Sequence, residues 1–275
     1  MGRIIAVANQ KGGVGKTTTS INLAACLAEK GKKVLAVDMD PQGNLTSGLG
    51  VDKDSVEKSI YELIIGEVDI KEVINKEVLE NLDIIPTSID LSAAEIELIG
   101  VDDKEYILRN AIDQVKDQYD FVIIDCPPSL SMLTINAMTT ADSVIVPIQC
   151  EYYALEGLSQ LIHTVELVKD RLNSKLEIEG VVFTMYDART NLSLQVVENV
   201  KDNLQQNIYK TIIPRNIRLA EAPSYGLPIN KYDPKSTGAE SYMRLADEVI
   251  EREEEKIRRF PWLLRKKDWE KDLIV

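Results

Sequence analysis

A glycine-rich segment with two lysines, residues 11–18, reads KGGVGKTT and has the residue types that bind phosphate. Its three glycines let the backbone turn and bring N–H groups close to phosphate oxygens. Lys16 can neutralise the β- and γ-phosphates of a nucleotide, and the Thr17 hydroxyl can ligate Mg²⁺. The residues that we expect to contact the nucleotide here are Lys11, Gly12, Gly13, Val14, Gly15, Lys16, Thr17 and Thr18.

The segment departs from the usual phosphate-loop pattern GxxxxGK[ST] at its start. Gln10 occupies the position of the opening glycine, and a second lysine, Lys11, follows it. Lys11 lies too far back to be the ordinary phosphate lysine. The apolar run IIAVA precedes the loop and a helical pattern follows it, so the positive end of a helix points at the same place. This context predicts a nucleotide site with an additional cation.

Three aspartates follow apolar runs and complete the predicted site. KVLAVD ends at Asp38 and continues into a loop that contains Asp40, and FVIID ends at Asp125. Acidic residues at strand carboxyl ends face the ligand crevice of an open α/β sheet. We expect Asp125 to be a Walker B carboxylate and Asp40 to position the attacking water. The predicted metal-site residues are Thr17, Asp38 and Asp125, and the predicted catalytic residues are Lys11, Lys16 and Asp40.

The elements that must position these residues are apolar strands alternating with helices. Strands are predicted at residues 3–8, 33–38, 82–86, 121–125, 143–147, 180–185 and 209–213, and helices at 17–30, 104–116, 155–172 and 239–256. Continuous apolar strands are typical of a parallel sheet covered on both faces. The sequence therefore predicts an α/β fold with one doubly wound, mostly parallel sheet. We expect one domain over residues 1–250 and a tail over 251–275.

The composition excludes several classes of protein. Apolar residues make up 44% of the 275 residues, which excludes global disorder, and three separated cysteines do not make a disulfide scaffold. No long uncharged apolar run is present, and the N-terminus breaks into glycine and lysine too soon for a signal peptide, so we expect a cytoplasmic protein. The net charge is −13, and residues 51–120 hold 19 acidic against 7 basic side chains. A basic patch elsewhere is therefore not excluded.

Seven motifs in order resemble the ParA/Soj group of chromosome- and plasmid-partitioning ATPases. They are KGGVGKTTT, VDMDPQGN, IIDCPPS, CEYYALEGL, TMYDARTN, IPRNIRLAEAP and YDPKSTGAE, spread over residues 1–250. The resemblance implies a deviant Walker A P-loop ATPase that uses ATP and Mg²⁺ and is slow on its own. It also implies an ATP-bound sandwich homodimer that binds double-stranded DNA non-specifically and associates with the nucleoid. A ParB-type centromere-binding partner would stimulate hydrolysis and release the dimer.

The resemblance assigns roles to residues of this chain. Lys11 matches the signature lysine that reaches across the dimer to the other subunit's nucleotide, where it would act like an arginine finger. Asp40 matches the hydrolysis aspartate of the family. Pro214 and Asn216 match positions that line the adenine, and Glu151 matches a carboxylate near the dimer interface.

Two arginines are candidates for DNA contact, since sequence-independent binding needs only cations that reach phosphates. Arg189 and Arg218 each lie in a loop that follows a predicted strand, and both loops should leave the same side of a parallel sheet. We expect these arginines to form a patch that becomes continuous on dimerisation.

The C-terminal tail leaves an alternative open. Residues 256–267 read KIRRFPWLLRKK, and mixed basic and aromatic residues are typical of an interfacial membrane anchor. MinD-type membrane-cycling ATPases share the deviant loop and end in such a helix. Pro261 interrupts a helix in this tail, and the motif DPQGN together with the arginine loops favours the partitioning interpretation. We therefore expect no membrane partner.

Overall fold

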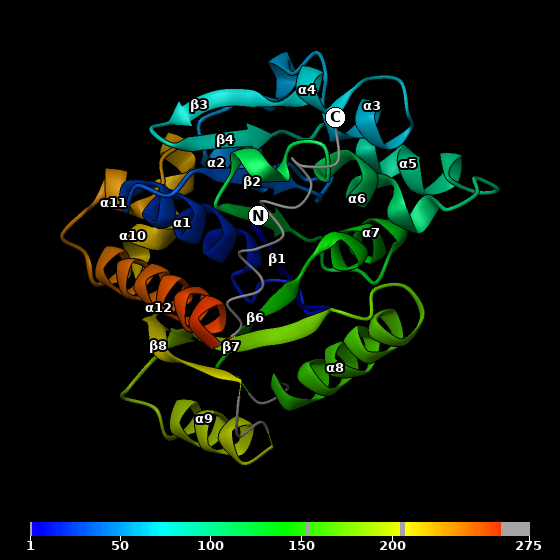
Figure 1. Ribbon diagram of the computed structural model, residues 1–275. Coiled ribbons are helices and arrows are strands. Elements are labelled where there is room, and N and C mark those ends of the chain that lie inside the picture. The colour runs from blue at the N-terminus through cyan, green and yellow to red at the C-terminus, as the bar shows by residue number, and fades with distance from the viewer. Residues whose placement is uncertain (1, 152–153, 204–206, 260–275) are drawn as a thin grey trace.

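Eight strands form one sheet in the computed structural model, which describes residues 2–151, 154–203 and 207–259 (Figure 1). The strand order is β3-β4-β2-β5-β1-β6-β7-β8, and every neighbouring pair is parallel except β3 with β4. The strands are β1 (Arg3–Val7), β2 (Val34–Asp38), β3 (Asn75–Leu79), β4 (Leu82–Ile85), β5 (Phe121–Asp125), β6 (Ser143–Gln149), β7 (Glu177–Tyr186) and β8 (Ile208–Pro214).

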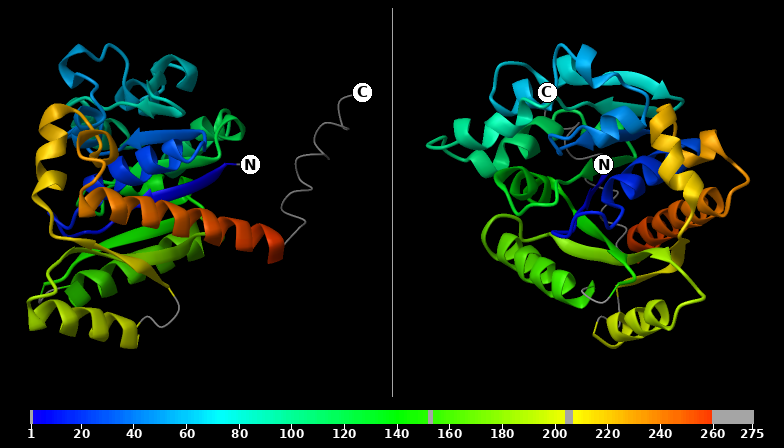
Figure 2. Two further views of the ribbon diagram at one scale, coloured as in Figure 1. Left: turned by 90° about the vertical axis from the view of Figure 1, so that its left-hand side faces the viewer. Right: turned by 180° about the vertical axis from the view of Figure 1, so that it is seen from behind.

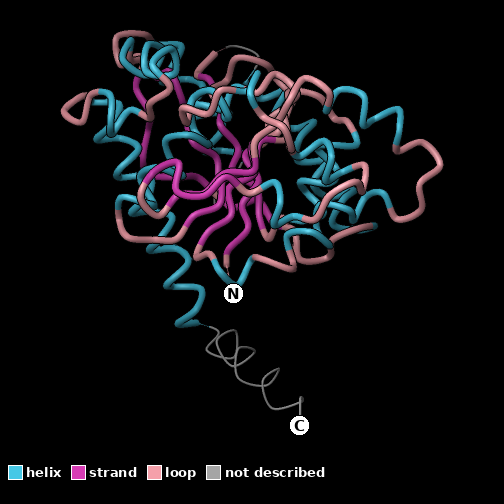
Figure 3. Tube along the Cα trace, turned by 90° about the horizontal axis from the view of Figure 1, so that it is seen from above, coloured by secondary structure: helices cyan, strands magenta, loops and turns pink. Residues whose placement is uncertain are grey.

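Helices cover both faces of this sheet (Figure 3). One face packs against α1 (Lys16–Glu29), α2 (Asn44–Gly48), α10 (Ile217–Glu221), α11 (Ile229–Tyr232) and α12 (Thr237–Arg259). The other packs against α3 (Ile60–Ile64), α4 (Ile70–Val73), α5 (Leu91–Glu97), α6 (Ile107–Ile112), α7 (Met132–Thr140), α8 (Ala154–Arg171) and α9 (Asn191–Asn203). Within the described ranges, no helix combines the length and the apolar character needed to cross a membrane.

The predicted fold class and all seven predicted strands are confirmed. The eighth strand, β3, escaped prediction because it pairs only with β4 at the sheet edge and reads NKEVL, so it has no apolar run. The helix predicted over residues 104–116 is wrong in extent. Only α6 is α-helical there, and 3₁₀ turns lie on either side of it at Lys104–Tyr106 and Lys116–Gln118.

Helix α12 runs without a break through residue 250, where we expected the tail to begin. Its C-terminal end extends past the strands (Figure 2). Residues 260–275 lie outside the described part of the chain. The boundary at residue 250 and the membrane alternative that depends on the tail both stay predictions.

The register of the central strands brings the predicted acidic residues together. Strands β2 and β5 are buried along their whole length, since helices cover them on both sides. Asp38 lies opposite Asp125, and Val7 pairs with Asp125 from the other side. The carboxyl ends of β1, β2 and β5 therefore meet where β1 runs into the glycine-rich loop.

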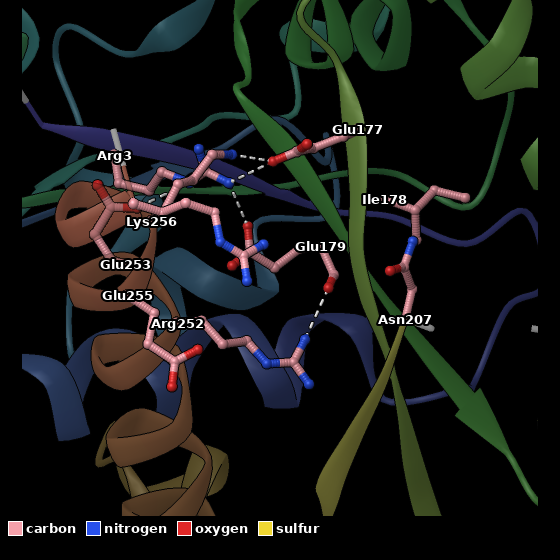
Figure 4. A pocket seen from close by; sticks show the side chains of 10 residues that line it. Arg3, Glu177, Ile178, Glu179, Asn207, Arg252, Glu253, Glu255 and Lys256 are labelled. Atoms are coloured by element: carbon pink, nitrogen blue, oxygen red, sulfur yellow. Dashed lines mark hydrogen bonds and ion pairs between the residues drawn. The ribbon is translucent and has the colours of Figure 1, made fainter. Parts of the chain in front are cut away.

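An ionic network links the C-terminal half of α12 to the amino ends of strands β1 and β7, around a cavity of about 420 Å³ (Figure 4). Arg3 at the start of β1 donates to Glu179 at 2.7 Å and to Glu177 at 3.2 Å, and Lys256 on α12 also pairs with Glu177. Arg252 donates to the backbone carbonyl of Glu179 at 2.8 Å. The side chains of Arg3 and Glu179 are only 10% and 7% exposed.

Replacing Arg3 with methionine should lower the free energy of unfolding by about 2–4 kcal/mol, because Glu179 would keep a buried charge without its cation. The matched control is Arg258→Met, since Arg258 pairs with Glu254 at 3.3 Å while 74% exposed. It should cost less than about 1 kcal/mol. Urea unfolding of both variants measures the difference, and equal losses would contradict a supporting role for the buried network.

Candidate nucleotide-binding site

The glycine-rich loop between β1 and α1 forms an open cradle. Gly13 and Gly15 have φ angles of 74° and 86°, in the left-handed region that residues with a Cβ rarely adopt. No heavy atom lies within 4 Å of a Cβ built at Gly12 or Gly13. The backbone there is therefore free to approach a ligand closely, and Gly15 places the loop directly before the positive end of α1.

Lys16 points back into this loop from the first turn of α1. Its side chain is buried and its Nζ donates to the backbone carbonyl of Lys11 at 3.1 Å. Burial lowers the pKa of Lys16, and the negative charge of Asp125 opposes that shift. A phosphate oxygen in the loop would give this ammonium a stronger acceptor than a neutral carbonyl.

The side chains of Thr17 and Asp125 are in hydrogen-bond contact, so both could lie close to one metal ion. The Thr17 hydroxyl donates to Asp125 Oδ2 at 2.8 Å, and the Ser20 hydroxyl donates to Oδ1 at 2.7 Å. Asp125 is fully buried, and this burial together with the nearby charge of Asp38 raises its pKa to about 8. A threonine hydroxyl beside a desolvated carboxylate is a donor set that suits Mg²⁺ with bound phosphate. The residues present therefore fit a magnesium nucleotide.

Asp38 ends β2 and Asp40 lies in the loop that follows, and the two aspartates differ in their contacts. Asp38 Oδ2 accepts from the Thr46 backbone N–H at 2.8 Å and its hydroxyl at 2.7 Å, while Oδ1 accepts from the Asp40 N–H at 3.2 Å. Burial raises the pKa of Asp38 to about 6. Asp40 Oδ1 accepts from the N–H of Gln42 at 3.0 Å. Asp38 thus holds α2 in place through Thr46, and its role as a metal ligand stays a prediction.

Lys11 and Glu151 contact each other within one chain. Lys11 Nζ lies 3.2 Å from Glu151 Oε2, and the two side chains are 33% and 46% exposed. The Lys11 backbone N–H donates to the Asn9 side chain at 3.0 Å, so the backbone is fixed while the ammonium is held by a solvated pair. Such pairs contribute at most about 1 kcal/mol, so Lys11 can leave Glu151 at little cost.

A cavity of about 450 Å³ adjoins the loop at Gly15 and Thr18. Pro214 and Asn216 line it together with apolar side chains that include Ile213 and Leu219, and their contact with an adenine stays a prediction. The Asn216 side chain accepts from the Arg218 N–H at 2.8 Å and donates to Thr237 at 2.9 Å. One N–H and one lone pair of this amide remain for a base.

The two candidate DNA arginines follow neighbouring strands, since β7 and β8 end side by side in the parallel register. Arg189 lies in the loop after β7, as expected. The loop predicted for Arg218 is wrong, because Asn216 caps α10 and Arg218 lies in its first turn. Arg189 is 87% exposed and forms hydrogen bonds of 2.9 and 2.7 Å with Asp187. These hydrogen bonds hold the pKa of Asp187 well below its usual range. Arg218 is 54% exposed and pairs with Glu221 at 2.9 Å. Each cation therefore has a carboxylate partner of its own chain.

Three polar residues of the site were missed by sequence reasoning. Ser20 shares Asp125 with Thr17, Thr46 binds Asp38, and Thr184 on β7 donates to the Val14 carbonyl at 2.8 Å. A serine or threonine within an apolar element has the same sequence signature whether it supports a site or bonds its own helix. Only the tertiary pairing separates the two cases.

Known proteins are similar to this chain over most of its length. Residues 2–178 match the family AAA_31, described as an AAA domain. The chain is 59% identical over 249 residues to the sporulation initiation inhibitor protein Soj of Bacillus subtilis, covering 90% of this chain and 98% of that protein. It is 51% identical over 253 residues to the chromosome partitioning protein ParA of Myxococcus xanthus, covering 92% and 89% respectively.

A solved structure has the same fold with a ligand. It is cobyrinic acid a,c-diamide synthase from Mycobacterium smegmatis with bound ATP analogue and magnesium. The TM-score is 0.81 at 39% sequence identity, and the match covers 91% of this chain and 95% of that chain.

The buried carboxylates should make the nucleotide-free protein less stable as the pH rises. Asp125 is protonated in the fold up to about pH 8, whereas an unfolded aspartate loses its proton near pH 4, so stability falls between these values. Replacing Asp125 with asparagine should reduce the loss between pH 6 and pH 8 by about 1–2 kcal/mol. Denaturant unfolding of both proteins at each pH gives the two slopes, and identical slopes would refute the assignment.

Proposed function

Because the chain belongs to the ParA/Soj family of partitioning ATPases, we propose that it binds ATP with Mg²⁺ and hydrolyses it as an ATP-bound homodimer that holds DNA. We further propose that a ParB-type partner stimulates the hydrolysis and releases the dimer. The observation that carries the proposal is the contact of Thr17 with buried Asp125 beside the Lys16 loop. This arrangement supports a triphosphate with its metal ion better than any other ligand.

In the proposed hydrolysis reaction, the residues described above have different roles. Lys16 would bind the β- and γ-phosphate oxygens, and Mg²⁺ held near Thr17 and Asp125 would supply charge neutralisation. Asp40 orients a water molecule, whose oxygen bonds to the γ-phosphorus as the bond to the β–γ bridging oxygen breaks. ADP and phosphate result. Lys11 of the second subunit adds positive charge where negative charge accumulates.

The Lys11–Glu151 pair supports a switch between subunits. In the single chain the ammonium of Lys11 is held by Glu151 at 3.2 Å. A triphosphate across the interface carries more negative charge than one carboxylate, so Lys11 exchanges partners on dimerisation. Because the Lys11 backbone is held by Asn9, only the side chain has to move.

Substituting Asp40 with alanine should trap the dimer, because ATP binds but hydrolysis falls by about 100-fold or more. In size-exclusion chromatography the variant should elute as a dimer with ATP and as a monomer with ADP. The control is Lys11→Ala, which keeps Lys16 and Thr17 but removes the cross-subunit charge and should stay monomeric with ATP. Monomers of the Asp40 variant in every nucleotide state would overturn the proposal.

The proposed DNA patch rests on the positions of Arg189 and Arg218 and on their ability to exchange a carboxylate partner for a DNA phosphate. Both arginines follow the carboxyl ends of strands, on the same side as the nucleotide site, and both side chains are exposed although they pair with carboxylates of their own chain. A DNA phosphate can replace such a carboxylate at little cost. Dimerisation doubles the number of cations that engage DNA in one event, so binding should follow ATP.

Reversing the charge of Arg218 in the ATP-bound dimer should weaken DNA binding by at least about 10-fold at moderate salt, and Arg189→Glu should act similarly. Each variant removes two phosphate contacts per dimer, so the logarithmic salt slope should fall by about 2. Arg258→Glu, on the exposed end of α12, is the control. If Arg189→Glu and Arg218→Glu both bind DNA as tightly as the original protein across a salt series, DNA contacts another part of the protein.

The remaining parts of the proposal concern partners and place. A protein that binds DNA without sequence preference is concentrated on the nucleoid in the cytoplasm. There it meets a ParB-type protein bound at its own DNA sites. The relatives Soj and ParA support this role by their family membership.

A further inference from the structure

A surface of exposed apolar side chains surrounds α5 and is not used by the nucleotide site. We name it the α5 surface. It consists of Ile89, Ile96, Ile99 and Val101, which are 66, 72, 74 and 43% exposed. Acidic residues frame it, namely Asp90, Glu95, Glu97, Asp102 and Asp103. The segment projects from the side of the molecule in two opposite views (Figures 1 and 2).

The apolar side chains of this surface are not needed for the core. Leu91, Ala94 and Leu98 form the buried stripe of α5, at the spacing of one helix face. A helix that covers a sheet normally presents polar residues on its outer side. Here Ile96 and Ile99 lie on the solvent side, where they lower solubility without adding to packing. Exposed apolar patches of this kind mark interaction sites.

The acidic frame determines which partner fits. Five carboxylates within residues 90–103 oppose one lysine, Lys104, so the phosphates of DNA are repelled. Two copies of this chain that met through the α5 surface would bring the same carboxylates together, which is also unfavourable. A protein segment that alternates apolar and basic side chains satisfies both features. Its apolar residues cover the isoleucines and its cations meet the frame.

The α5 surface is connected to the nucleotide site through hydrogen bonds. β4 ends at Ile85, and two residues later the backbone N–H of Thr87 donates to the Thr46 hydroxyl at 3.1 Å. That hydroxyl donates to Asp38 at 2.7 Å, and Asp38 accepts from the N–H of Asp40. Ile89 follows two residues after Thr87. Hydrogen bonds therefore link the segment just before α5 to the loop that holds Asp40.

We propose that the α5 surface is the docking site for an apolar and basic segment of the ParB-type partner. The proposal rests on the proposed function, which requires such a partner to stimulate hydrolysis. Docking draws Ile89 and the turn before α5 toward the partner. The hydrogen bonds through Thr87 and Thr46 then carry the shift to Asp40, which positions the water. The partner thus acts on hydrolysis without entering the nucleotide site.

The test measures ATP hydrolysis with DNA while the ParB-type protein of the same cell is titrated. The double variant Ile96→Ser/Ile99→Ser should keep the basal rate and need at least 10-fold more partner for half-maximal stimulation. Leu167→Ser is the matched control, since Leu167 is an exposed leucine on α8. It should respond like the original protein. Glu95→Lys/Asp102→Lys should also need more partner, with a weaker salt dependence.

Each other outcome decides against the proposal. Normal stimulation of both double variants would remove the α5 surface as the docking site. Loss of ATP-dependent dimerisation in size-exclusion chromatography would make a second copy of this chain its occupant. If the unaltered protein dimerises and binds DNA but never responds to the partner, the proposed function itself fails in that part. Matching melting temperatures for the variants separate all of these results from misfolding.

Discussion

The carboxylate of Asp125 is the constraint on which the nucleotide site depends. It is fully buried at the end of a central strand and opposite a second buried carboxylate, Asp38. A charge so placed is unfavourable without strong partners. Thr17 and Ser20 supply hydroxyl donors from α1, which fixes that helix against β5 and aims its positive end at the glycine-rich loop. In the metal-free protein the proton on Asp125 avoids the repulsion with Asp38, whereas a divalent cation would favour the ionised form, so metal binding, pH and local stability are linked.

Buried and exposed charges have different roles in this protein. Buried ones, such as Arg3 with Glu179, keep their partners because losing one costs several times more than a surface pair is worth. Exposed ones, such as Lys11 with Glu151 and Arg189 with Asp187, hold their partners weakly. The second group is the one that our proposal requires to change partners, to a nucleotide across a dimer and to DNA. Exposure of an ion pair is thus what allows it to switch.

The sequence predicts the fold class and the parallel strands because buried parallel strands are continuous apolar runs rich in valine and isoleucine. It predicts the phosphate loop because few backbones other than a glycine-rich turn can approach phosphate. It does not predict β3, whose solvated side chains resemble a loop, nor the supports Ser20, Thr46 and Thr184. Ser20 and Thr184 bond residues far away in sequence, while Thr46 bonds Asp38 across a turn, and a single sequence does not show which hydroxyl forms such a contact.

The strand order is compatible with our proposals that this acidic protein engages both DNA and a basic partner. The α5 surface follows β4 near one edge of the sheet, whereas Arg189 and Arg218 follow β7 and β8 at the other edge. Most of the net charge of −13 lies in residues 51–120, which include the α5 surface. The width of the sheet therefore separates the acidic side from the arginines by more than a Debye length, about 8 Å at physiological salt. With that screening, we expect the acidic surface not to weaken the proposed phosphate binding at the far edge.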